Sequence, residues 1–169
     1  MNNYQTFRKS KDEFFGRHPQ SPLTHQQKKS FAGLAYFPVD ETLRLEIQID
    51  EFSDKEQVVM QTSTGDEQTY YRFGRFQFEV DGHQAELTVY FNDHGFFMPF
   101  VDALAGRETY GAGRYLEPEE LPDGRFLIDF NMAYNPYCAY NERWSCPIPP
   151  FENRLKVPIR AGEKVFKGD

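Results

Sequence analysis

The sequence predicts a mainly β fold, in which an antiparallel meander closes as a barrel or folds as a sandwich after one or two short N-terminal helices. From residue 34 onward, apolar residues recur at every second position in about eight short runs, which is the period of a half-buried strand. Turn signals separate these runs at hairpin spacing, and no helical pattern alternates with them. Aromatic residues, which are favoured on pleated sheets, make up 17% of the chain.

Residues 1–33 are expected to form helices that pack on the sheet. Over Tyr4–Phe15 the aromatic residues fall near helical spacing, with charged residues between them. The segment HPQSP at 18–22 ends this helix, because proline lacks the amide donor and restricts the residue before it. Thr24 followed by Gln27 is typical of a capping box and predicts a second short helix.

Residues 34–130 are expected to form the meander. The first strand alternates apolar and polar residues over Leu43–Ile49. The dipeptide Asp81-Gly82 favours a type I′ hairpin turn, and Gly74 interrupts an aromatic strand as a β-bulge would. Further strands are expected at 58–64, 70–80, 85–91, 96–101, 111–116 and 125–130. Barrel closure would remove the sheet edges, which are a liability for such aromatic strands.

Residues 131–169 are rich in proline and then basic, and are expected to wrap around the meander as an irregular segment. Lys164–Phe166 is expected to add an edge strand. A chain of 169 residues suits a single domain spanning 1–169. At this length a hydrophobic core needs neither disulfides nor metals.

Charge is unevenly distributed along a chain whose formal net charge is −7. Residues 1–30 carry six Lys or Arg against two Asp or Glu, and residues 154–169 carry five against two, so that residues 31–153 are strongly acidic. An acidic body disfavours a nucleic-acid partner, because phosphate contacts need clustered Lys and Arg. The basic ends are expected to lie on the acidic body, which could alternatively attract a cationic ligand.

The N-terminus lacks the apolar core of a signal peptide, and no run approaches the roughly 20 apolar residues of a membrane helix. As given, the chain is therefore expected to be cytoplasmic, without a membrane partner. Its two cysteines are expected to be free thiols in that reducing compartment. The oligomeric state is left open.

Both cysteines lie in the stretch Asp129–Leu155, which also holds the only tryptophan. The separation of Cys138 and Cys146 fits neither a CxxC redox pair nor a zinc knuckle. Three roles remain open: buried structural thiols, a disulfide, or catalysis or metal binding, with Cys138 as a nucleophile that a histidine or a positive helix terminus would activate. The four histidines are distant in sequence and form no metal motif, so no metal and no cofactor are expected.

The segment 100–115 carries charged residues among glycines. Arg114 could hold a carboxylate or phosphate through two parallel hydrogen bonds. It could equally pair with Asp102 or Asp129 and so hold the barrel shut. The two carboxylates could also act as an acid–base pair if they face one cavity.

Several distinctive motifs follow one another along the chain, namely RKSKDEFF, FVD followed by ETYGAGRYL, DFNMAYNPYCAY, SCPIPPFENRL and IRAGEK. Together they resemble an uncharacterised, mainly prokaryotic family catalogued as domain of unknown function 1684, over Phe7 to Lys164. The resemblance implies no activity, cofactor or substrate. It implies that residues 100–115 and 129–155 belong to one unit. Members of the family often look secreted or lipid-anchored, and this chain departs from them because it shows no leader.

These observations favour a soluble protein that binds a small polar or anionic ligand at a barrel mouth formed by residues 100–115 and 129–155. Arg114 would hold the anion. Phenols and amides would supply walls and hydrogen bonds, namely those of Tyr110, Tyr115, Tyr134, Tyr140, Asn131 and Asn135, although loop asparagines also bond their own backbone. One alternative is a hydrolase or lyase that uses Asp102 or Asp129 as acid–base, with Cys138 as a weaker nucleophile candidate. Another is a structural or partner-binding module, which an exposed aromatic patch would favour.

Overall fold

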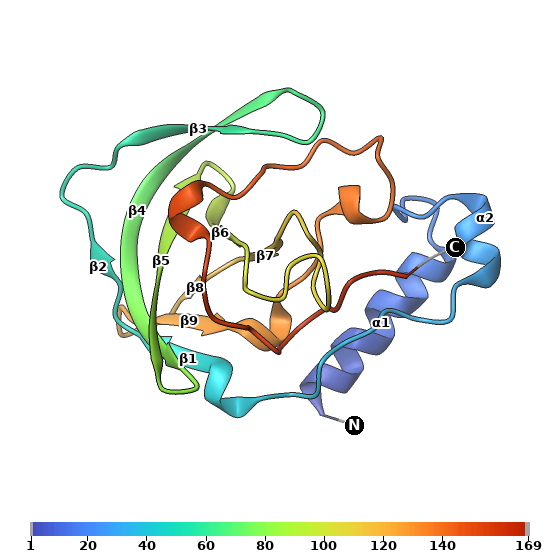
Figure 1. Cartoon of the computed structure of the whole chain (residues 1–169), viewed down its shortest axis with the longest axis horizontal. Helices are drawn as coiled ribbons and strands as arrows, with labels where there is room; N and C mark the ends of the chain where they lie inside the picture. Colours follow the sequence, from blue (N-terminus) through green and yellow to red (C-terminus); the bar gives the residue numbers. More distant parts are fainter. Residues whose placement is uncertain (1, 168–169) are drawn as a thin grey trace.

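The computed structural model describes residues 2–167 and is mainly β, with two N-terminal helices and two antiparallel sheets (Figure 1). The helices are α1 (Asn3–Arg17) and α2 (His25–Ser30). The strands are β1 (Arg44–Ile47), β2 (Asp50–Glu51), β3 (Gln57–Gln61), β4 (Glu67–Val80), β5 (His83–Asn92), β6 (Gly95–Phe100), β7 (Arg114–Leu116), β8 (Glu119–Glu120) and β9 (Phe126–Asp129). Short 3₁₀ helices cover Glu41–Leu43 (η1), Phe130–Met132 (η2), Tyr137–Ala139 (η3) and Phe151–Asn153 (η4).

Both α-helices begin with capping boxes, in which the side chains of two residues each accept a hydrogen bond from the backbone amide of the other residue. The predicted box of α2 is confirmed, because Thr24 accepts from the amide of Gln27 and the Gln27 side chain accepts from the Thr24 amide. Asn2 and Gln5 form a corresponding box at α1. In Figure 1 the helices stand at the opposite side of the molecule from the long curved strands β4 and β5.

The larger sheet is the expected meander, with strand order β2-β4-β5-β6-β7 and with β3 also paired to β4. Asp81 and Gly82 both have positive φ angles, of 51° and 81°, and turn β4 into β5 as the sequence predicted. The register of that pair shifts between Arg72 and Gly74, which confirms the predicted bulge. A Cβ on Gly74 would lie 2.6 Å from the carbonyl of Asp50, so the bulge lets β2 approach closely.

The smaller sheet has the order β1-β9-β8, and no strand pairing joins it to the larger sheet within residues 2–167. The predicted barrel closure is therefore not found, and the two sheets resemble the sandwich alternative more closely. The chain passes from the larger sheet at β7 to the smaller one at β8 through Pro118. Proline has no amide donor, so it cannot extend a ladder from one sheet into the other.

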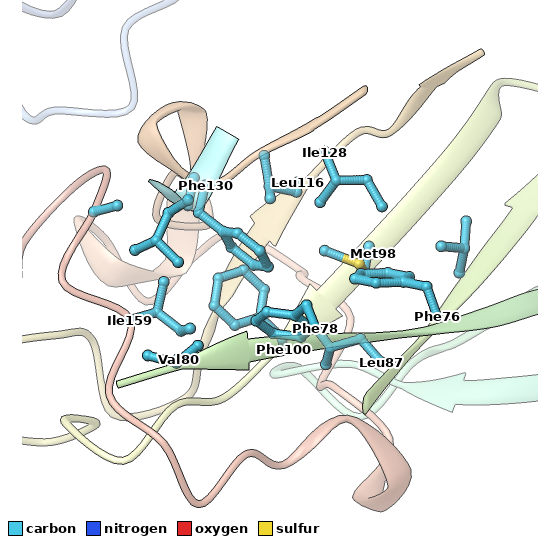
Figure 2. Close-up of a cluster of buried hydrophobic side chains, with 14 of the residues drawn as sticks. Phe76, Phe78, Val80, Leu87, Met98, Phe100, Leu116, Ile128, Phe130 and Ile159 are labelled. Atoms are coloured by element: carbon cyan, nitrogen blue, oxygen red, sulfur yellow. The ribbon is translucent and has the colours of Figure 1, made fainter. Parts of the chain in front are cut away.

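The main core lies between the two sheets (Figure 2). Phe78 of β4 stacks on Phe130 at a ring distance of 5.2 Å, and Phe100 of β6 meets the same ring edge-on at 5.5 Å. Ile128 of β9 and Ile159 from the C-terminal segment complete this core and are at most 1% exposed. Each such side chain stabilises the fold by about 1.5–3 kcal/mol through apolar burial.

The expected edge strand at Lys164–Phe166 is not formed. Instead this segment makes single backbone contacts with separate parts of the chain. Lys164 donates to the carbonyl of Ala35 at 2.8 Å, and Val165 donates to that of Glu108 at 2.9 Å. The C-terminal segment runs across the molecule toward the helices, so that it ties the helical side to the sheets (Figure 1).

Candidate functional site

Residues 100–115 and 129–155 meet at a pair of tyrosines. Tyr115 of β7 and Tyr134, which follows η2, exchange two backbone hydrogen bonds of 2.8 and 3.0 Å. Their rings lie 5.8 Å apart and nearly perpendicular. The phenol of Tyr115 also donates to the carbonyl of Pro147, so a third segment is fixed at the same place.

A cleft of about 620 Å³ opens beside these two tyrosines, and we call it the tyrosine cleft. Its volume lies within the range of small-molecule sites. Aromatic walls come from β4, β6, β7 and the segment after η2, and they comprise Tyr70, Phe96, Phe97, Tyr115 and Tyr134. The polar groups of the lining are Gln68, Asn92, His94, Glu117 and Glu119.

The charges of the tyrosine cleft are acidic. Glu117 and Glu119 both line it and are exposed, and the lining contains no Lys or Arg. The Tyr134 phenol donates to Oε1 of Glu117 at 2.6 Å. Burial, and then this hydrogen bond, raise the pKa of Tyr134, and burial raises that of Tyr115. Both phenols therefore stay protonated at neutral pH and can donate hydrogen bonds.

A second cavity of about 230 Å³ adjoins the tyrosine cleft and shares Tyr115 and Tyr134 with it. Cys146 and Trp144 line this smaller cavity. The backbone amide of Cys138 donates to Sγ of Cys146 at 3.3 Å, and both cysteines are free thiols.

The two thiols differ in acidity. A hydrogen bond from the Cys146 side chain lowers the pKa of Cys138 to about 6, and the Tyr110 phenol, 3.7 Å from Cys138 Sγ, acts in the same direction against the effect of burial. The same contact with Cys138, together with burial, raises the pKa of Cys146. One sulfur of the pair therefore carries negative charge more readily, while the other keeps its proton.

Asp129 lies at the end of β9, where its Oδ1 caps η2 by accepting from the amide of Asn131 at 3.0 Å. Its other oxygen accepts from the Tyr4 phenol of α1 at 2.6 Å. It lines a cavity of about 260 Å³ together with Glu117 and Tyr134. Burial, followed by the bond to Asp129, raises the pKa of Tyr4 to about 12.

Arg114 and Asp102 lie inside the protein, away from the tyrosine cleft and the other cavities described above. The guanidinium is 1% exposed and donates to three carbonyls of the C-terminal segment, those of Ile159, Ala161 and Glu163. Asp102 accepts from the Thr109 hydroxyl and from the amide of Ile159, and its Oδ2 lies 4.0 Å from Arg114 Nη2. In this arrangement the guanidinium presents no face to a ligand, because its bonds hold the chain to itself.

Asn131, Asn135 and Tyr140 are also buried, and they connect distant segments. The Asn131 side chain exchanges hydrogen bonds of 2.9 Å with the backbone of Asp40. The backbone amide of Asn135 and the phenol of Tyr140 both donate to Oε1 of Glu163. This carboxylate is 1% exposed and also pairs with Lys11 of α1. These residues fix the helices and the C-terminal segment, and none of them lines the tyrosine cleft.

Comparison with known proteins places the chain in a family. The family described as Protein of unknown function (DUF1684) matches residues 29–164, which is most of the chain. The chain belongs to this family. Among solved structures, this DUF1684 chain is similar to an uncharacterized protein of Haloarcula marismortui, determined in solution by NMR. The TM-score is 0.70 at 36% sequence identity, with 95% of this chain and 91% of that chain covered. A search of curated proteins found no match.

Neither a metal-binding cluster nor a membrane-spanning helix is present among the residues that the structure describes for this DUF1684 chain. Within residues 2–167, no group of three or more His, Cys, Asp or Glu side chains is arranged to hold a metal ion. None of the helices described for the chain is both long enough and apolar enough to cross a bilayer.

Sequence reasoning found Tyr115 and Tyr134 but missed the other half of the tyrosine cleft. Glu117 was detectable, because it lies two positions after Tyr115 and alternate residues of an extended chain share one side. Tyr70 of β4 and His94 of the β5–β6 turn are distant from the two tyrosines in sequence. No local pattern connects them to the tyrosines, so only the folded DUF1684 chain brings them together.

Proposed function

We propose that this protein binds a small polar ligand carrying a positive charge in the tyrosine cleft. The observation that supports this most directly is the pairing of aromatic walls with the carboxylates of Glu117 and Glu119, in a lining without Lys or Arg. Aromatic faces and carboxylates are the groups that recognise organic cations in proteins.

The polarity of the proposed ligand differs from the sequence-based expectation of a polar or anionic one. That expectation depended on Arg114, whose donors are directed to the carbonyls of Ile159, Ala161 and Glu163. An anion in the tyrosine cleft would instead meet two carboxylates. A cation would gain from both of them, and from the acidic middle of the chain.

Each group of the cleft has a specific part in this proposal. Tyr134 donates to Oε1 of Glu117 and so orients that carboxylate, which leaves Oε2 for the ligand. Tyr115 is held by its bond to Pro147 and supplies a rigid wall. Because these two positions are fixed within the protein, the ligand does not have to order them when it binds.

The test is a titration with small organic cations and matched anions. Tetramethylammonium, putrescine and arginine amide, as chlorides, are compared with acetate, citrate and glutarate, as sodium salts, by ligand-observed NMR and by thermal shift. At least one cation is expected to bind and to raise the midpoint, since a ligand of the native state stabilises it. Binding of the anions alone would overturn the proposal.

Glu117→Gln and Glu120→Gln form a matched pair of variants for this test. Glu120 is exposed on β8 and does not line the tyrosine cleft. A charge-assisted contact contributes about 1.5–3 kcal/mol, so Glu117→Gln is expected to weaken cation binding roughly tenfold or more. The glutamine oxygen still accepts from Tyr134, which preserves the wall. Equal affinities of the two variants would exclude Glu117 from the site.

A further inference from the structure

Cys138 and Cys146 lie at the two ends of one short loop that also carries Trp144, the only tryptophan of the chain. The amide of Cys138 donates to Sγ of Cys146 at 3.3 Å. The two sulfurs are therefore neighbours in the reduced protein, and the short loop between them already brings its ends together.

The surroundings of the two cysteines are unequal. Cys146 is 7% exposed, and two hydrogen bonds hold its backbone on the β3–β4 turn. Its amide donates to the Ser63 hydroxyl, and its carbonyl accepts from the Ser63 amide. Cys138 is half-buried in the single turn of η3. Cys138 is thus the more exposed residue of the two, while Cys146 is the anchored one.

The acidities of the two thiols agree with this geometry. The pKa of Cys138 is lowered to about 6, foremost by the hydrogen bond from Cys146 and further by Tyr110. These contacts favour the thiolate of Cys138, which is the nucleophilic form of cysteine. Cys146 keeps its proton while it donates to that negative charge.

We propose that Cys138 and Cys146 are a reversible redox pair, in which Cys138 reacts with a hydroperoxide and Cys146 resolves the product into an intramolecular disulfide. The sequence left these thiols as structural, disulfide-bonded or reactive. The inference does not depend on the proposed ligand, because it concerns a different cavity and a different reaction.

The chemistry balances with hydrogen peroxide as the oxidant. The Cys138 thiolate attacks one peroxide oxygen, the O–O bond breaks, and Cys138 becomes a sulfenic acid. The leaving hydroxide takes a proton from the solvent and becomes water. Cys138 is then neutral, so the charge that held the Cys146 proton is gone. The Cys146 sulfur attacks Cys138, an S–S bond forms, the S–O bond breaks, and hydroxide leaves with the Cys146 proton as a second water. An external dithiol returns the pair to its reduced form.

The adjoining cavity of about 230 Å³ lies on the Cys146 side of the pair, and Cys138 does not line it. Cys146, Trp144 and Tyr137 line it, and the Tyr137 and Trp144 rings lie 5.2 Å apart. Trp144 Nε1 is buried without a hydrogen-bond partner. A bond between the two ends of the loop changes the surroundings of this indole, so its fluorescence reports the oxidation.

The experiment oxidises the full chain with stoichiometric hydrogen peroxide and then follows intact mass and Trp144 fluorescence. The wild type is expected to lose the mass of two hydrogen atoms, to change its fluorescence and to recover both on addition of dithiothreitol. Peptide mapping is expected to join Cys138 to Cys146 within one chain. Failure to form this bond, or bonds only between chains, would overturn the proposal.

Two variants distinguish the roles of the sulfurs. Cys146→Ser is expected to accumulate a sulfenic acid on Cys138 that dimedone traps. Cys138→Ser is expected to react at least tenfold more slowly, because its remaining thiol, Cys146, is only 7% exposed. Equal rates for the two variants would contradict the assignment of Cys138 as the attacking thiol. If both thiols resist peroxide until the protein unfolds, they are structural and the proposal fails.

Discussion

The side-chain amide of Asn153 pairs with the backbone of Thr88 in both directions, as a neighbouring strand would. Thr88 N–H donates to Asn153 Oδ1 at 2.9 Å, and Asn153 Nδ2 donates to the carbonyls of Thr88 and Pro99 at 2.9 Å each. Asn153 is fully buried, so these bonds join the C-terminal segment to β5 and β6 away from solvent.

Asn153→Ala is expected to destabilise the protein by about 3 kcal/mol, because it leaves three buried backbone groups without partners. Urea denaturation measures the loss. Asn141→Ala is the matched control, since Asn141 makes a local contact with the amide of Arg143 in an exposed loop. A cost for Asn153→Ala no larger than that of the control would show that the three bonds contribute nothing.

Arg114→Lys is expected to cost about 3 kcal/mol, even though it keeps the charge. Burial lowers the pKa of Arg114 to about 10, so the guanidinium is still protonated at pH 7 and uses its planar fork on three carbonyls. A lysine ammonium cannot reproduce that fork. Arg107→Lys, at an exposed position with one bond to Ala103, is expected to change the free energy of unfolding by less than about 0.5 kcal/mol. Similar midpoints for both variants in chemical denaturation would contradict the structural role of Arg114.

Gly113→Ala tests the close approach of backbone just before β7. Gly113 has a φ of 101°, and a Cβ there would lie 2.6 Å from the carbonyl of Phe100. Gly82 also has a positive φ, of 81°, but a Cβ there meets nothing within 4 Å. Gly82→Ala is expected to cost about 1–2 kcal/mol from the left-handed backbone alone. Gly113→Ala is expected to cost at least about 2 kcal/mol more, because the carbonyl has to move. Thermal denaturation of the pair gives the difference, and equal losses would remove the packing contribution.

The rate at which iodoacetamide alkylates Cys138 is expected to depend on pH with a midpoint near 6. Cys138 is protonated and unreactive below its pKa of about 6, so the rate rises through that pH and levels off above it. Cys146→Ala removes the largest cause of the lowered pKa and is expected to move the midpoint up toward about 8.5, the value of an unperturbed thiol. Tyr110→Phe is expected to give a smaller shift in the same direction. A midpoint near 8.5 in the wild type would exclude a preformed thiolate.

The features of this fold that the sequence predicted are those that depend on a few consecutive residues. The capping box of Thr24 and Gln27, the Asp81-Gly82 turn and the bulge at Gly74 all follow from local hydrogen bonding or from the absence of a Cβ. Such features form in the same way wherever the segment lies in the fold, so the local sequence is enough to predict them.

The pairing partner of each strand could not be predicted in full from a few consecutive residues. The alternating pattern of β1 identifies its buried face but not its neighbour, which is β9, more than seventy residues later. The buried asparagines show the same limit. Loop position suggested local backbone bonds. The Asn131 side chain instead bonds the backbone of Asp40, and the Asn135 side chain donates to the carbonyl of Lys164, because each satisfies a segment that arrives from elsewhere in the chain.

The site was predicted only in part, for a related reason. Tyr115 and Tyr134 stood out because their segments are rich in unusual residues, and the structure brings them together. Arg114 stood out equally, although a buried guanidinium and a ligand-binding one look alike in sequence. The difference lies in the carbonyls that surround it, and these belong to a segment more than forty residues away.

The bonds of Arg114 also determine when the protein can finish folding. Its acceptors are carbonyls that lie 45 to 49 residues further along the chain. In the same way, β1 can pair only after β9 has been synthesised. During synthesis, the sheets therefore emerge from the ribosome before the segment that carries the hydrogen-bond acceptors of this buried guanidinium. Contacts so distant in sequence slow folding and leave aromatic strands exposed meanwhile. Residue 163 therefore has to leave the exit tunnel before the Arg114 guanidinium can bond all three of its acceptors.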